Sequence, residues 1–208
     1  YFETNKTACS WKKLHPDMTI FVDQEGGSVV RIPDAAPPSP RDSKKLTESA
    51  FYNGVKKSAK KLKDLCIDVN LAPMVEMSNG DSRSYGATAQ NIVPRATLFS
   101  RAMQSEGIRT VLKHFPGWHD DCIPLKDLNS IKLKVKIGSE ATKCRIGNNL
   151  AQFNKSISVF KEVPADAWMI GNNIYEELGP YPSTMNPEVI ALVRNNLGYK
   201  GLVISDAL

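Results

Sequence analysis

Asp206 is a carboxylate residue that lies within the otherwise mostly apolar segment Gly201–Leu208. A strand that ends on a charged side chain is the usual way in which a barrel enzyme presents a catalytic group. Other apolar segments also lead to residues that could do chemistry, namely Asp23, Glu76, Lys113 with His114, and Asn172 with Asn173. Carboxylates, amines and imidazoles serve in general acid–base and nucleophilic catalysis. We therefore expect these side chains to converge on one polar site.

Alternating strand and helix patterns would position these side chains. The predicted strands are Met18–Val22, Cys66–Leu71, Thr110–Leu112, Ala167–Ile170 and a strand within Gly201–Leu208. The predicted helices are Ser43–Leu65, Gln90–Glu106, Leu150–Glu162 and Pro187–Leu197. Such alternation is typical of parallel strands joined by right-handed helical crossovers, and it indicates an α/β fold. Periodicity alone leaves open whether the sheet closes into a barrel or is open and doubly wound.

The composition indicates a globular protein with one core. The chain has 208 residues, of which 41% are hydrophobic and 24% charged. A parallel (β/α)8 barrel usually needs about 250 residues. We therefore expect residues 1–208 to form a single partial barrel that is a fragment of a longer protein. No apolar stretch suggests a membrane segment, and the oligomeric state is left open.

The net charge of +5 fits a weak attraction to anionic substrates. Its densest cluster, Lys56–Lys63, lies in a helical pattern without interleaved aromatic residues, which is typical of a solvated helix face. No nucleic-acid partner is therefore expected.

The four cysteines, Cys9, Cys66, Cys122 and Cys144, form no CxxC pair and have no metal-ligand spacing with the three histidines. We expect neither a metal nor another cofactor. Reduced thiols in a cytoplasmic protein are the first interpretation. A bridge between Cys122 and Cys144 would require an oxidising compartment, periplasmic or secreted.

One long segment interrupts the alternation of strands and helices. Trp118–Asn149 is basic, has little periodicity and follows directly after Lys113, His114 and their neighbours. A loop of this length inside a compact domain is usually functional or mobile. We treat it as an atypical loop of the partial catalytic domain.

Four motifs together resemble the family 3 glycoside hydrolases, and within them the bacterial β-N-acetylglucosaminidases of peptidoglycan recycling. In chain order they are Asp23–Gly27, Gly80–Gly86, Lys113–Gly117 and Val203–Asp206. Each stands at a predicted strand end or just beyond one. The resemblance covers nearly the whole chain outside the Trp118–Asn149 loop. It implies a TIM-type (β/α)8 barrel that is incomplete in this chain, with strands missing at both ends.

The resemblance also implies roles for individual residues. Asp206 is expected to be the nucleophile that forms a covalent glycosyl-enzyme, as a retaining mechanism requires. Asp23, Arg83, Lys113 and His114 are expected to bind the sugar, since carboxylates accept hydrogen bonds from hydroxyl groups and cationic side chains donate them. Glu25 is interpreted as a structural partner in the turn after Asp23.

The chain departs from the family pattern where the acid/base catalyst is expected. The family carries an Asp-Ser-His whose histidine exchanges the proton, whereas this chain has Asn129 in the histidine's place. Asp127 retains the orienting position. His119, with Asp120 or Asp121 beside it, could take the catalytic role, because an imidazole oriented by a carboxylate suits proton transfer.

Two further departures lie elsewhere. Ser28 stands where an arginine is common, and Asn172 stands where a histidine is common.

These features predict a retaining glycosidase of the β-N-acetylhexosaminidase type that removes terminal β-linked N-acetylglucosamine from cell-wall-derived saccharides. Two alternatives remain open from the sequence. One is a catalytically impaired homologue that binds sugar, which the Asn129 departure favours. The other is a β-glucosidase of the same fold, because no residue is seen to recognise the 2-acetamido group.

Overall fold

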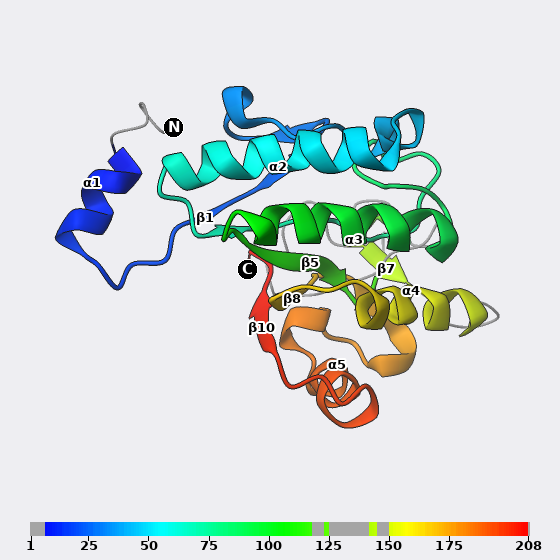
Figure 1. Ribbon diagram of the computed structural model, residues 1–208. Coiled ribbons are helices and arrows are strands. Elements are labelled where there is room, and N and C mark those ends of the chain that lie inside the picture. Colours follow the sequence, from blue (N-terminus) through cyan, green and yellow to red (C-terminus); the bar gives the residue numbers. More distant parts are fainter. Residues whose placement is uncertain (1–6, 118–122, 125–141, 145–149, 208) are drawn as a thin grey trace.

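The computed structural model describes residues 7–117, 123–124, 142–144 and 150–207 of the chain (Figure 1). All five predicted strands are present, and they form one parallel sheet. The strands are β1 (Phe21–Val22), β4 (Val69–Asn70), β5 (Arg109–Phe115), β8 (Ala167–Ile170) and β10 (Leu202–Ser205). They lie in the order β1-β4-β5-β8-β10, which is also their order along the chain.

This strand order decides between the two architectures that the sequence left open. A doubly wound sheet reverses its strand order at a switch point, whereas the order here runs in one direction. Repeated right-handed crossovers in one direction place the connecting helices on one face of the sheet, as in a (β/α)8 barrel. In Figure 1, α2 (Glu48–Asp64) and α3 (Ala89–Ser105) lie side by side in chain order, followed by α4 (Leu150–Glu162).

Capping residues set the starts of the helices. The Thr47 side chain accepts a hydrogen bond from the Ala50 backbone N–H, and α2 begins at Glu48. The predicted start at Ser43 is therefore wrong, because a 3-10 turn occupies Arg41–Lys45. Asn186 likewise caps α5 (Pro187–Ala191), with Pro187 at the first helical position. The helix continues as a π-helical turn, Leu192–Asn196.

Two apolar clusters lie on opposite faces of the sheet. The helix-side core includes Leu112 of β5 with Trp168 and Ile170 of β8. The other face carries Val111 of β5 and Met169 of β8. Successive strand residues point to opposite faces, and this alternation explains both sets.

A disulfide joins Cys9 of α1 (Thr7–Leu14) to Cys66, which precedes β4. Lys12 of α1 also forms an ion pair with Asp68, and α1 lies at one edge of the molecule (Figure 1). The interpretation of Cys9 and Cys66 as reduced thiols is therefore wrong. Cys144 is disulfide-bonded as well, while Cys122, its expected partner, lies outside the described residues. Spacing failed to predict the Cys9–Cys66 bond because it depends on where α1 packs, 57 residues from Cys66.

Two smaller sheets complete the described structure. The hairpin β2 (Gln24–Gly26) and β3 (Val29–Val30) follows β1 directly. In the second, β6 (Ile123–Pro124) pairs with β7 (Thr142–Cys144), and β7 pairs with β9 (Ile174–Tyr175). The expectation of a loop without regular structure over Trp118–Asn149 is thus wrong for β6 and β7. Strands of two and three residues are too short to give a period, and β9 is distant in sequence.

No helix within the described ranges has both the length and the apolar character needed to cross a membrane.

Candidate active site

Lys113 lies at the centre of a buried ionic cluster at the carboxyl end of β5. Its ammonium nitrogen is 2.6 Å from Oδ1 of Asp23 and 2.7 Å from Oε1 of Glu25. Lys113 is two residues beyond Val111, so strand alternation directs it toward the same face of the sheet, away from the helices. The side chain is 4% exposed, and its charge is therefore balanced by partners instead of water.

Glu25 connects Lys113 to Arg83. Arg83 donates two hydrogen bonds to its carboxylate, from Nε to Oε2 at 2.9 Å and from an Nη atom to Oε1 at 2.8 Å. Burial opposes ionisation of Glu25, but the hydrogen bond from Arg83 and the charges of Lys113 and Arg83 outweigh it and hold the pKa of Glu25 below its ordinary value. The same hydrogen bond raises the pKa of Arg83. The interpretation of Glu25 as a structural partner agrees with these contacts.

His114 lies beside Lys113 and joins two further carboxylates. Its Nδ1 is 2.9 Å from Oε1 of Glu76, and its Nε2 is 3.7 Å from Oδ2 of Asp206. Consecutive residues of a regular strand point to opposite faces, but the pairing of β5 with β8 shifts register between Lys113 and Phe115. This irregularity lets both Lys113 and His114 contribute to the polar site.

Asp206 follows the last residue of β10. Its backbone N–H donates to the Ile170 carbonyl at 2.9 Å, which aligns it with the end of β8. One carboxylate oxygen, Oδ1, accepts a hydrogen bond from the Ala207 N–H at 2.7 Å. The other, Oδ2, is the oxygen that lies near His114. The side chain is 34% exposed, so a ligand can reach it.

Buried amides fix the backbone on which Asp23 and Glu25 stand. Asn70, at the end of β4, accepts from the Gln24 N–H and donates to the Gln24 carbonyl. The Gln24 side chain in turn accepts hydrogen bonds from the backbone N–H groups of Arg31 and Ile32. Both amide side chains belong to fully buried residues. Neither residue was among the predicted site residues, although an amide at a strand end or just after one was a signal for them.

The contact between Glu76 and His114 was also not predicted from the sequence. The available signal was a carboxylate shortly after the predicted strand Cys66–Leu71, but nothing in the sequence indicated its partner. The two residues that depart from the family pattern outside the acid/base region both form hydrogen bonds. The Oγ atoms of Ser28 and Ser82 are 3.0 Å apart, and Asn172 donates to the Ala207 carbonyl.

The structure thus brings five of the predicted site residues into two adjacent groups, which meet where His114 follows Lys113 in the chain. One group contains Asp23, Arg83 and Lys113, and the other contains His114 and Asp206. The other two, His119 and Asp127, lie outside the described residues. Within the described part of the chain, no group of three histidine, cysteine or acidic side chains could hold a metal ion. The site offers partly exposed carboxylates at Asp23 and Asp206, with Lys113 paired to Asp23 and His114 beside Asp206. This is suited to holding a polyhydroxylated ligand.

A parallel α/β sheet of the barrel type, with its charged groups at the carboxyl ends of the strands, is the architecture of a TIM-barrel enzyme. Residues 2–208 match the glycosyl hydrolase family 3 N terminal domain, and the chain belongs to this family.

Several known proteins are similar to this chain. A protein named beta-hexosaminidase from Stenotrophomonas maltophilia (strain K279a) is 27% identical over 205 residues, which cover 90% of this chain and 57% of that protein. An uncharacterized secreted glycosyl hydrolase of Arthroderma benhamiae is 27% identical over 213 residues, covering 93% of this chain and 56% of that protein. The chain thus spans little more than half the length of these relatives.

Among solved structures, a family 3 β-N-acetylglucosaminidase from Paenibacillus sp. str. FPU-7 superposes with a TM-score of 0.79 at 24% identity. The match covers 98% of this chain and 40% of that one. It supports the barrel-type fold.

Proposed function

We propose that the protein is a retaining glycoside hydrolase that removes terminal, non-reducing β-linked N-acetylglucosamine from cell-wall-derived saccharides. The observation that carries the proposal is the placement of Asp206 beside His114, the residue that follows Lys113, while Lys113 is paired with Asp23. Family membership and relatives named beta-hexosaminidase support this choice of reaction and sugar.

In this mechanism, Asp23 accepts hydrogen bonds from sugar hydroxyl groups, while Lys113 and His114 hold neighbouring oxygens. Asp206 attacks the anomeric carbon and forms a covalent glycosyl-enzyme as the bond to the leaving oxygen breaks. A second group must protonate that oxygen and then remove a proton from the attacking water. His119 is the candidate for this role, with Asp120 or Asp121 to orient it, while Asp127 retains the orienting position of the family motif.

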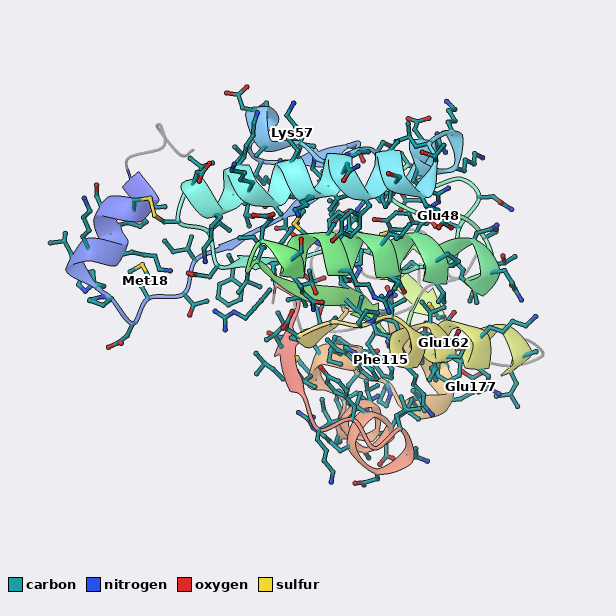
Figure 2. The ribbon with its side chains drawn as sticks, in the orientation of Figure 1. Met18, Glu48, Lys57, Phe115, Glu162 and Glu177 are labelled. Carbon is teal, nitrogen blue, oxygen red and sulfur yellow. A yellow bond between two sulfur atoms is a disulfide. The ribbon has the colours of Figure 1, made fainter. Side chains whose placement is uncertain are left out.

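Release of 4-nitrophenol from 4-nitrophenyl β-N-acetylglucosaminide tests the proposal. We expect turnover by the wild-type protein and by Glu162→Gln, a matched carboxylate-to-amide control at the exposed end of α4 (Figure 2). Asp206→Asn should lose activity without loss of secondary structure by circular dichroism. Normal turnover by Asp206→Asn would refute the assignment of the nucleophile.

Two further measurements separate the alternatives. If the protein is a sugar-binding homologue, N-acetylglucosamine should raise its melting temperature, and the aryl glycoside should not be cleaved. Asn129, which stands in the place of the family histidine, favours this alternative. Faster cleavage of the aryl β-glucoside than of the β-N-acetylglucosaminide would instead identify a β-glucosidase.

Of the two kinds of compartment that the sequence left open, we propose the oxidising one, periplasmic or extracellular. The Cys9–Cys66 disulfide supports it, because such bonds persist mainly in oxidising environments. A relative named as a secreted glycosyl hydrolase agrees with it. Mass spectrometry after alkylation of protein from its native source should find Cys9 and Cys66 unmodified until a reductant is added; modification beforehand would favour the cytoplasm.

A further inference from the structure

We propose that Glu76 is a positioning residue that acts through His114. Its carboxylate holds the proton of the imidazole on Nδ1 and thereby directs Nε2 toward Asp206 and the bound sugar. This inference rests on the proposed function and adds a residue to that site.

The backbone holds Glu76 alongside the end of β5. The Val75 N–H donates to the Lys113 carbonyl at 2.8 Å, and Met74 forms a parallel bridge with Lys113. Glu76 follows Val75, and its backbone carbonyl accepts a hydrogen bond from Oγ of Ser84 at 2.7 Å. These contacts place the Glu76 side chain next to His114 before any ligand binds.

The imidazole is also confined from another direction. Gly171, just after β8, lies so close that a Cβ atom built there would be 2.7 Å from Cβ of His114. Gly171 therefore packs against the base of the His114 side chain, and a side chain larger than hydrogen at position 171 would displace His114. The His114 and Glu76 side chains are 15% and 12% exposed, so water competes little for their hydrogen bond.

The chemistry of the ring follows from this geometry. A carboxylate only accepts hydrogen bonds, so the 2.9 Å contact requires a proton on Nδ1. In the neutral ring, Nε2 is then an acceptor. An acceptor at this position, 3.7 Å from Oδ2 of Asp206, suits a sugar hydroxyl that lies next to the nucleophile. The opposite tautomer would present a donor instead and would bind such a hydroxyl in a different geometry.

Two substitutions separate the hydrogen bond from the charge. Glu76→Gln keeps an oxygen that can accept from Nδ1, whereas Glu76→Leu removes the acceptor at similar volume. Nitrogen-15 NMR of the imidazole rings reads the tautomer directly. The chain has only three histidines, so the His114 signals can be assigned by comparison with His114→Gln.

We expect the Nδ1–H form in the wild type and in Glu76→Gln, and a substantial Nε2–H population in Glu76→Leu. With the aryl N-acetylglucosaminide, Glu76→Gln should stay within a few-fold of wild-type kcat/KM, while Glu76→Leu should fall at least about tenfold. Glu162→Gln serves as the control for both measurements.

An Nε2–H ring in the wild type, or unchanged tautomer and turnover in Glu76→Leu, would overturn the inference. A wild-type protein that cleaves no glycoside would instead count against the proposed function, and the NMR result would still decide whether Glu76 sets the ring.

Discussion

Oε1 of Glu25 lies 2.7 Å from Nζ of Lys113, and each side chain is less than 5% exposed. The pair connects the β1 end of the sheet to β5. Because Arg83 occupies the other side of the Glu25 carboxylate, Glu25 is enclosed by protein, and Asp23 is the more exposed acidic partner of Lys113. Glu25 therefore maintains the geometry of the site, while Asp23 is accessible to a ligand.

Removing the charge of Glu25 should destabilise the fold in a pH-dependent way. The folded pKa of Glu25 is lowered, so its stabilising contribution is present above the unfolded value of about 4.3 and is lost as pH falls through the folded pKa. Breaking a buried ionic pair costs about 3–5 kcal/mol. Urea unfolding should show that deficit for Glu25→Gln at pH 7, shrinking below pH 4. A deficit that stays constant with pH would contradict the assignment.

Asp23→Asn should weaken sugar binding more than it weakens the fold. Asn keeps the size of the side chain but replaces one acceptor oxygen with a donor, and the residue is 34% exposed. We expect KM to rise at least about tenfold while the melting temperature changes by a few degrees. An unchanged KM would remove Asp23 from the substrate site.

Lys113→Met leaves Glu25 with one cationic partner. This variant should therefore lose more stability than Asp23→Asn.

Reduction of the Cys9–Cys66 disulfide should destabilise the protein. The bond closes a loop with a sequence separation of 57 residues, for which loop entropy predicts a stabilisation of about 4 kcal/mol. The double variant Cys9→Ser/Cys66→Ser should therefore unfold at lower denaturant than the wild type. The same dose of reductant should lower its stability less than that of the wild type, because the disulfide of Cys144 is still present.

If His119 is the acid/base catalyst, His119→Ala should slow glycosides with poor leaving groups far more than activated aryl glycosides, because only the former need a proton during bond cleavage. Competition between an aryl glycoside and a disaccharide gives this ratio. Equal effects on both substrates would remove His119 from the role.

The sequence predicted the position of Asp206, Lys113 and Asp23 because one local rule applied to all three: an apolar strand ends on a charged residue. The boundaries of Leu150–Glu162 and Ala167–Ile170 were also correct. Asn149 and Pro164 flank the first segment, and Asp166 and Gly171 border the second. Parallel pairing then required these strand ends to meet at one edge.

Contacts between distant segments were not predictable in the same way. The Glu76–His114 hydrogen bond joins residues 38 apart, and the Cys9–Cys66 bond depends on the packing of a terminal helix. The pairing of β7 with β9 involves strands too short to leave a periodic pattern. Each of these features depends on the tertiary arrangement, so composition and spacing contain no direct sign of it.

The sequential order of β1, β4, β5, β8 and β10 has a consequence for biosynthesis. Each strand finds its neighbour in the segment translated just before it, so the sheet can grow by one unit at a time as the polypeptide leaves the ribosome. Asp206, which follows the last of these strands, leaves the ribosome after Asp23, Arg83 and Lys113, so the site cannot be complete before this strand has been made.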